Sequence, residues 1–220
     1  MNDGYSKTLQ DIASSEPTPG GGSVAAMALA HGHALAVMVS RLTLSREKWI
    51  DGHEAARVVI ALSEEGMSDS MAMAEADAES FDMVMQAYRM PRNNDDEIAL
   101  RKTAIRMATI GAAKSPLSIA RASQALLDST LELAKFGNSN ALTDLAASAE
   151  LARASYIIAS MNVRINLDSI DGDESDVIST ELSSIGDAVD GSYAEISAII
   201  KERLGSVSYT HLTLPTIYSV

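Results

Sequence analysis

Hydrophobic positions recur along the chain at the three- and four-residue spacing of helices that each bury one face. Prolines, glycines and short polar segments separate these stretches, as is typical of helix boundaries. The pattern predicts an all-α fold, an antiparallel helical bundle in a single domain that spans residues 1–205. The expected helices cover residues 6–14, 24–44, 52–90, 95–113, 115–136, 139–167 and 174–204, and Pro116 marks the break between the fourth and the fifth.

Residues 24–44 are apolar on nearly every side, which is typical of a helix enclosed by others or of a membrane span. The run is short for a bilayer and carries His31 and His33 near its middle. The sequence also has no second apolar stretch of that length. We therefore expect a buried apolar central helix and no membrane partner.

Residues 206–220 differ in kind from the rest of the chain. They are uncharged, rich in Thr and Tyr, and strand-like, whereas the preceding part is acidic and helical. The segment also resembles a translated sequencing adaptor. We expect a non-native or disordered tail that takes no part in the fold.

Composition and charge narrow the function. Aromatic residues make up only 4% of the chain, which favours helices packed through small side chains. A net charge of −13 disfavours nucleic acid and anionic membranes as partners. The absence of cysteine excludes disulfides and thiolate metal sites, and the N-terminus has no secretion-signal pattern. These features predict a cytoplasmic protein.

One acidic residue interrupts an apolar helical face. That face is predicted to be buried, and Asp77 projects into it, whereas Glu75, Glu79 and Asp82 lie at its edge or beyond. Burial would raise the pKa of such a carboxyl group and suit it to proton transfer. A structural ion pair or helix cap is the alternative interpretation. The face comprises Met67, Met71, Ala74, Ala78, Phe81, Met85 and Tyr88.

A polar stripe runs along the expected helix 139–167. Asp144, Ser148, Ser155, Asn162 and Asn166 lie within about 40° of one line on that helix. Amide and carboxylate groups in a row could bind the donors and acceptors of a heteroaromatic ring. Small polar residues also bond between packed helices, and we favour that role for the two serines.

A glycine run precedes the central helix. Gly20, Gly21 and Gly22 are followed by Ser23, but no Lys-Ser/Thr pair or preceding strand supports a phosphate loop. Such a backbone can approach a ligand closely, although a plain turn would also use glycine.

Charged and metal-binding side chains give weaker signals. The basic residues Arg46 and Lys48 could hold carboxylates or form a solvated helix end. The histidines have no metal-binding spacing, so we expect no metal site.

Several segments, in this order and spacing, carry a resemblance to a known family. They are Pro19-Gly20-Gly21-Gly22-Ser23-Val24-Ala25-Ala26, Asp77-Ala78-Glu79-Ser80-Phe81, Ala87, Met90-Pro91, Pro116-Leu117, Gly137-Asn138, Asp144 and Asn162-Val163-Arg164-Ile165-Asn166-Leu167. Together they resemble the cyclodeaminase/cyclohydrolase family, which comprises the cyclodeaminase half of formiminotransferase-cyclodeaminase and stand-alone methenyltetrahydrofolate cyclohydrolases. The resemblance implies an all-α bundle that dimerises through helices, with Asp77 at the position of the family's catalytic aspartate.

By this resemblance the protein is expected to act in tetrahydrofolate one-carbon metabolism as a methenyltetrahydrofolate cyclohydrolase. A formiminotetrahydrofolate cyclodeaminase is the second possibility, and a non-enzymatic helical homo-oligomer is the third. A homodimer is expected, with no cofactor beyond the tetrahydrofolate substrate. The expected substrate-binding residues are Gly20, Gly21, Gly22, Ser23, Arg46, Lys48, Asn138, Asp144, Asn162 and Asn166.

Overall fold

The computed structural model describes the backbone of residues 3–211 and the side chains of residues 3–205. Within that backbone the chain forms helices and connecting turns but no strand, so the predicted all-α fold is confirmed. The elements are α1 (Asp3–Ile12), α2 (Gly21–Leu44), the 3-10 helix η1 (Glu47–Gly52), α3 (His53–Tyr88), α4 (Asp95–Phe136), the 3-10 helix η2 (Ser139–Ala141), α5 (Leu142–Leu167) and α6 (Asp173–His211).

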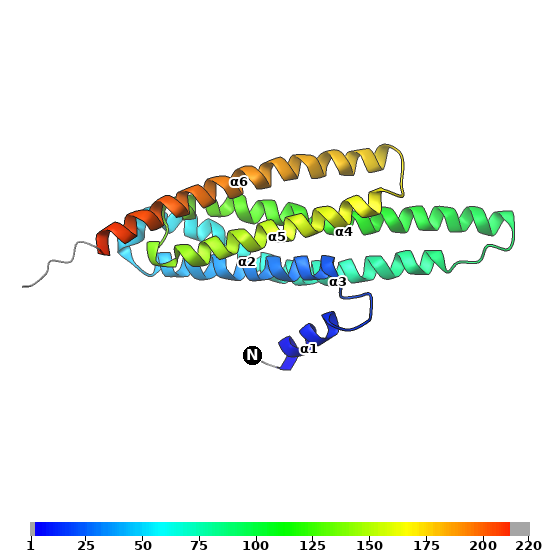
Figure 1. Cartoon of the computed structure of the whole chain (residues 1–220), viewed down its shortest axis with the longest axis horizontal. Helices are drawn as coiled ribbons and strands as arrows, with labels where there is room; N and C mark the ends of the chain where they lie inside the picture. Colours follow the sequence, from blue (N-terminus) through cyan, green and yellow to red (C-terminus); the bar gives the residue numbers. More distant parts are fainter. Residues whose placement is uncertain (1–2, 212–220) are drawn as a thin grey trace, which may run out of the picture.

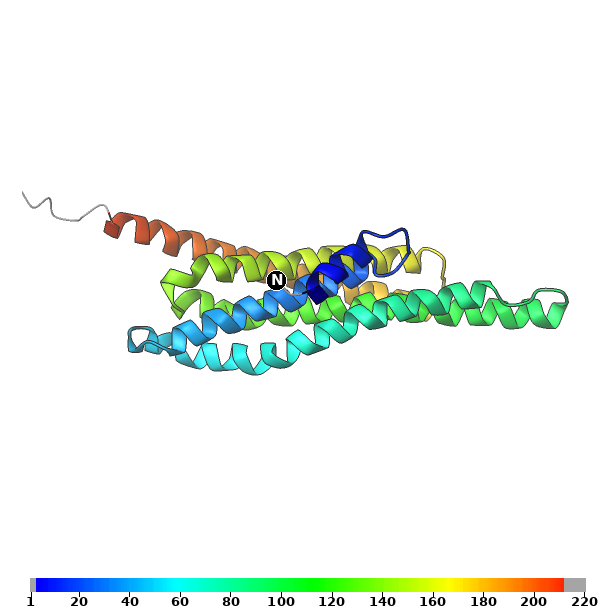
Figure 2. The same ribbon diagram turned by 90° about the horizontal axis from the view of Figure 1, so that it is seen from below.

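Helices α2 to α5 form a ring in which each packs against two neighbours, and α6 covers α4 and α5 (Figure 1). Successive helices run in opposite directions, which confirms the antiparallel bundle. The end of α3 and the start of α4 extend together beyond the other helices (Figure 2). Helix α1 stands apart from the bundle on the side of α2, and its Tyr5 ring contacts His31 edge to face.

The expected break at Pro116 is wrong, because α4 continues through this proline as one helix of 42 residues. An interior proline removes one helical hydrogen bond, which usually breaks or kinks the helix. Here the Asn166 side chain of α5 donates to the Ala112 carbonyl at 2.9 Å. Ala112 lies four residues before Pro116, so the freed acceptor is satisfied from a neighbouring helix.

Helix α2 is the buried apolar helix that the pattern predicts. Its length and composition would suit a membrane span, but 61% of its most apolar 18-residue stretch is buried inside the bundle. The Ser148 and Ser155 hydroxyls of α5 donate to the carbonyls of Gly32 and Ala25 at 2.7 and 2.8 Å. The two serines therefore bond between packed helices, as expected.

The predicted buried face of α3 is largely wrong. Met71, Phe81, Met85 and Tyr88 are between 36% and 49% exposed. Small residues of α3 are buried instead, because its close neighbours α2 and α4 leave little room between the helices. The buried positions are Ala56, Val59, Ser63, Ser70, Ala74, Ser80 and Ala87.

Helix α6 continues to His211, past the expected end near residue 204. Residues 212–220 lie outside the described part of the chain. The prediction that residues 206–220 form a non-native or disordered tail remains a prediction.

Candidate functional site

A pocket of about 400 Å³ lies where α2 begins, between helices α3, α4 and α5 and the segment 17–22, which we call the glycine loop. Gly21 and Gly22 of this segment already belong to the first turn of α2, so the helix starts three residues earlier than expected. The pocket brings together six of the predicted site residues, from three separate segments. Its volume is within the range of small-molecule sites. The lining residues are Pro17, Thr18, Gly20, Gly21, Gly22, Asp77, Ser80, Phe81, Val84, Ala112, Asn162, Ile165 and Asn166.

Gly22 is required by the close approach of α2 to α3. A Cβ atom added at this position would lie 2.4 Å from Oδ1 of Asp77, closer than real Cβ contacts come. At Gly21 the nearest atom to such a Cβ is Ile158 Cγ2 at 3.9 Å. One glycine therefore makes room for the carboxylate, whereas its neighbour has space for a side chain.

Asp77 is half-buried and is held by the first turn of α2. The hydroxyl oxygen of Ser23 lies 3.2 Å from Asp77 Oδ2, and the backbone N–H of Ser23 also donates to the carboxylate. Burial raises the pKa of Asp77 above its ordinary value, and the two bonds from Ser23 act in the opposite direction. Burial is the larger effect, so the group is shifted toward accepting and holding a proton.

The Ser23 hydroxyl can serve both protonation states of Asp77. It lies 3.0 Å from the Ala74 carbonyl oxygen as well as 3.2 Å from Asp77 Oδ2. A hydroxyl donates one hydrogen bond and also accepts. Ser23 can donate to the ionised carboxylate, or it can donate to Ala74 and accept from the protonated acid. The arrangement suits a group that cycles between the two forms.

Ser23 adjoins the Asp77 pocket through its bonds to Asp77, whereas the other four predicted residues lie in a second pocket, of about 520 Å³, at the other end of α2. Arg46, Lys48, Asn138 and Asp144 line it. Gly22 lines the Asp77 pocket and Leu42 lines the second pocket. The two residues are separated along α2 by roughly 30 Å, at 1.5 Å per residue. The structure therefore divides the predicted site residues into two groups within one chain.

The second pocket is lined mostly by polar and charged side chains. Within residues 3–205 neither Arg46 nor Lys48 forms a salt bridge, and Lys48 Nζ lies 4.7 Å from the centre of the Trp49 ring. Asn138 uses its side chain to hold the turn between α4 and α5. Its Nδ2 donates to Leu42 O at 3.2 Å, and its Oδ1 accepts from Asn140 N at 2.9 Å.

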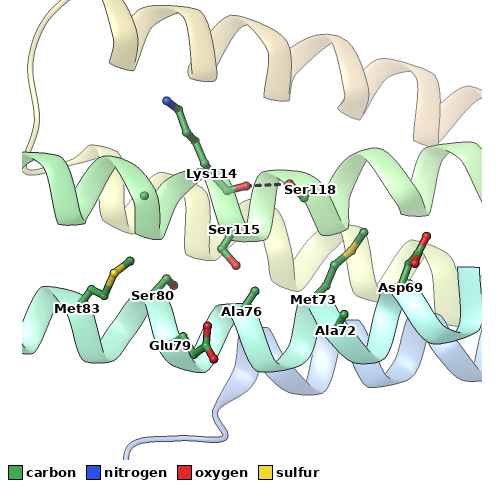
Figure 3. A pocket seen from close by; sticks show the side chains of 11 residues that line it. Asp69, Ala72, Met73, Ala76, Glu79, Ser80, Met83, Lys114, Ser115 and Ser118 are labelled. Atoms are coloured by element: carbon green, nitrogen blue, oxygen red, sulfur yellow. Dashed lines mark hydrogen bonds between the residues drawn. The ribbon is translucent and has the colours of Figure 1, made fainter.

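A third hollow, of about 630 Å³, is an open groove between α3 and α4 (Figure 3). It shares Ser80 with the Asp77 pocket but contains none of the predicted residues. Asp69 and Glu79 stand at its edges, and Lys114 is paired with Glu174. Of these three hollows, the Asp77 pocket alone combines a half-buried carboxylate with the glycine loop, and it is therefore the candidate site.

Sequence reasoning missed several apolar members of the Asp77 pocket. Phe81, Val84 and Ile165 supply apolar surface beside the polar groups, and Ala112 comes from α4. Phe81 and Ile165 lie in the quoted motifs, whereas nothing distinguishes Ala112 from the other alanines of its helix. Among the residues with described side chains, no group of three or more His, Cys, Asp or Glu could hold a metal ion.

Comparison with known proteins gives consistent matches. Residues 5–182 match the family model described as formiminotransferase-cyclodeaminase. The chain is 36% identical over 163 residues to methenyltetrahydrofolate cyclohydrolase from Methylorubrum extorquens, covering 74% of this chain and 78% of that protein. It is 31% identical to formimidoyltransferase-cyclodeaminase from Mus musculus, covering 72% of this chain but 29% of that protein. A solved structure, formiminotetrahydrofolate cyclodeaminase from Thermotoga maritima, superposes with a TM-score of 0.81 at 26% identity, covering 90% of this chain and 96% of that one.

Proposed function

The chain belongs to the formiminotransferase-cyclodeaminase family, and on that premise we propose that it is an enzyme of tetrahydrofolate one-carbon metabolism. The proposed reaction is hydrolysis of 5,10-methenyltetrahydrofolate to 10-formyltetrahydrofolate. The observation that carries this proposal is the half-buried carboxylate of Asp77 in a pocket that also offers apolar surface and amide groups. The Methylorubrum extorquens relative supports it, since the match covers most of both chains.

The hydrolysis needs one group that accepts a proton and returns it. Water attacks the methenyl carbon between N5 and N10, and the Asp77 carboxylate takes one of its protons. The C–N5 bond then breaks as N5 receives that proton, and the second water proton leaves to solvent as the formyl C=O forms on N10. The raised pKa of Asp77 and its flexible bonding to Ser23 support this cycle. The negative carboxylate also stabilises the cationic substrate.

Cyclodeamination is the second candidate, favoured by the structural similarity to the Thermotoga maritima cyclodeaminase. In that reaction N10 attacks the formimino carbon on N5, and the tetrahedral centre expels ammonia after protonation. Asp77 would take the proton from N10 and deliver it to the departing nitrogen. Both reactions use the same carbon centre and the same acid-base residue, so the pocket geometry fits either.

The two activities are separated by supplying the purified protein with each substrate in turn. A cyclohydrolase consumes added 5,10-methenyltetrahydrofolate, and the absorbance of the methenyl compound falls faster than in a protein-free sample. A cyclodeaminase given 5-formiminotetrahydrofolate produces the same absorbance together with an equal amount of ammonia. Failure to convert either compound contradicts the proposed function.

The enzyme is proposed to work as a homodimer that pairs through the outer face of α2 and α5. Each of these helices carries residues at three- and four-residue spacing that the single chain leaves unburied, and all of them except His31 are apolar or small, the pattern of helices that pack on a partner. We name this the α2/α5 face. Its residues are Met27, His31, Ala34, Met38 and Leu42 on α2, and Ala147, Leu151, Ala154, Ile158, Met161 and Ile165 on α5.

Charge substitutions test this dimer. Met38 and Met161 are 38% and 55% exposed in the single chain. Replacing both with Glu places a charge near each end of the proposed interface and is expected to yield a monomer in light scattering. Val177→Glu is the matched control, because Val177 is 64% exposed on α6, away from this face. An unchanged mass for the double variant excludes the α2/α5 face.

The α2/α5 face runs from one pocket to the other, since Leu42 lines the Arg46 pocket and Ile165 lines the Asp77 pocket. In a dimer whose two-fold axis lies in the plane of this face and perpendicular to the two helices, opposite ends of the two copies meet. Arg46 and Lys48 of the partner subunit then lie beside the Asp77 pocket. We propose that they bind the glutamate carboxylates of the folate tail there.

The enzyme is further proposed to be cytoplasmic and to need no cofactor beyond the folate itself. Acid-base chemistry on the methenyl or formimino carbon requires neither a metal nor a redox group. The lack of cysteine agrees with a reducing compartment.

A further inference from the structure

The proline inside α4 has a consequence for the Asp77 pocket. Pro116 has no N–H, so the carbonyl of Ala112, four residues earlier, has no partner within the helix. Asn166 of α5 supplies one, with Nδ2 at 2.9 Å from Ala112 O. Ala112 and Asn166 both line the pocket, although Pro116 does not.

The same amide group is held by a second bond. Asn166 Nδ2 also donates to the Asn162 carbonyl at 2.9 Å, so both of its N–H groups are used. Exchanging the amide nitrogen and oxygen would place an oxygen against two carbonyl oxygens, which is repulsive. The orientation of Asn166 is therefore determined, and its Oδ1 is left as the free polar atom of the side chain.

Asn162 repeats this arrangement one turn earlier. Its Nδ2 donates to the Ile158 carbonyl at 3.1 Å. Within residues 3–205 no donor of the chain bonds to Oδ1 of either asparagine. Both asparagines line the pocket from α5, as its α5 wall, and the Oδ1 of each is a hydrogen-bond acceptor that no described donor of the chain uses.

We propose that Pro116 is a positioning residue that determines which hydrogen-bonding atoms this wall offers. By leaving Ala112 O free, it draws the Asn166 amide nitrogen toward α4, and the two asparagine oxygens then bind the donor edge of the ligand. This inference rests on the proposed function. A reduced pterin has adjacent donors of the required kind, its exocyclic 2-amino group and a ring N–H.

Pro116→Ala tests the proposal, because alanine restores an N–H to α4 that competes with Asn166 for Ala112 O. The variant is expected to keep its melting temperature within a few degrees, since alanine is favourable in a helix interior. Its Kd for 5-formyltetrahydrofolate, measured by calorimetry, and its KM are expected to rise about 3- to 10-fold with little change in kcat. Pro91→Ala, in the loop between α3 and α4, is the control and leaves both values unchanged.

A double-mutant cycle separates positioning from general damage. If Pro116 acts through Asn166, Pro116→Ala causes no further rise in Kd in an Asn166→Ala background. An equal rise in both backgrounds, or no rise in either, overturns the proposal. If the parent protein binds 5-formyltetrahydrofolate but Pro116→Ala binds equally well, the positioning role fails and the proposed function stands. If the parent does not bind it, the proposed function itself fails.

The ligand can also be changed. An analogue that lacks the 2-amino group is expected to bind the parent protein about 10-fold more weakly, because a buried acceptor then loses its donor. Asn162→Ala/Asn166→Ala should discriminate between the two ligands much less. Equal discrimination by the parent and this double variant contradicts the assignment of the donor edge to the α5 wall.

Discussion

The two pockets at the ends of α2 differ in how many of their charged groups are bonded to other residues of the same chain. In the Asp77 pocket, four helices and the glycine loop converge on one half-buried carboxylate, and Ser23 bonds it from two directions. In the Arg46 pocket the two basic side chains have no salt bridge within residues 3–205, and Asn138 is occupied with holding its own turn. The Asp77 pocket therefore has the features of a reaction centre. The Arg46 pocket has those of a surface that binds a negatively charged group.

This difference shows what desolvation contributes. A charged group that is half-buried acquires an altered proton affinity, whereas one that faces water acts mainly as a fixed charge. Chemistry is therefore expected to depend on Asp77, and affinity on Arg46 and Lys48. The experiments on Asp77, Gly22 and Arg46 test that division of roles, and the experiment on His33 provides a contrast to Asp77.

The largest effect is expected from Asp77→Asn. The amide cannot accept and return a proton, so turnover should fall by about 10²- to 10⁴-fold. Because burial disfavours the charged carboxylate, the variant should be at least as stable as the parent near pH 7. Turnover assays and thermal unfolding check both statements. An active variant would remove Asp77 from the reaction.

Gly22→Ala should come next, with a loss of about 10- to 100-fold in kcat, because the added methyl group displaces the carboxylate. Gly111→Ala is the matched control, since a Cβ there has no atom within 4 Å. Gly21→Ala has room in the protein, so any loss there reports contact with the ligand. Normal turnover by Gly22→Ala would show that the position of Asp77 is unimportant.

The Arg46 pocket is tested by mixing two defective chains. Arg46→Glu/Lys48→Glu is expected to lower kcat/KM about 10-fold for a polyglutamylated substrate. Co-expressed with Asp77→Asn in equal amounts, it should form mixed dimers in which one site of two is complete, recovering roughly a quarter of the parent's sites. Activity that never exceeds the sum of the separate variants would show that the two pockets do not combine.

The smallest effect on activity is expected at His33, which is buried in the bundle core and bonded to Ser63. Burial lowers the pKa of His33 to about 4, whereas nearby Asp69 acts to raise it. Between pH 6.5 and 4 the unfolded chain therefore binds more protons than the folded chain, and stability falls as the pH falls. The loss should reach about 3 kcal/mol in urea unfolding.

His33→Gln should flatten this pH dependence without altering turnover, and His31→Gln, at an exposed position, should not. If the free energy of unfolding falls equally steeply with decreasing pH in the parent and in His33→Gln, the acid sensitivity comes from other groups. The comparison with Asp77 shows that a shifted pKa indicates a site only where a cavity accompanies it.

The helices could be predicted largely because their boundaries are local. Asn94 illustrates this, since its side chain accepts from Glu97 N at 2.9 Å and caps α4. The break at Pro116 could not be ruled out in this way, because the group that replaces its missing bond comes from Asn166, fifty residues away. The exposed side of α3 was also unpredictable, since burial depends on which neighbours pack against a helix.

Part of the candidate site could be predicted from the sequence. Asp77 stood out as an acid within an apolar face, and the structure places it with the glycine loop, Asn162 and Asn166. Within one chain Arg46 and Lys48 lie beyond the other end of α2, which separates them from these residues by roughly 30 Å. The apolar ring of Phe81, Val84 and Ile165 depends on tertiary packing alone.

The antiparallel pairing of α2 with α5 constrains how this chain can change length. Both helices run between the same two pockets, and their serine-to-carbonyl bonds hold them in one register. A residue gained or lost inside either helix would rotate the following side chains by about 100° and misalign every later contact. Insertions and deletions in natural variants are therefore expected in the α3–α4 loop or in α1, outside these two helices.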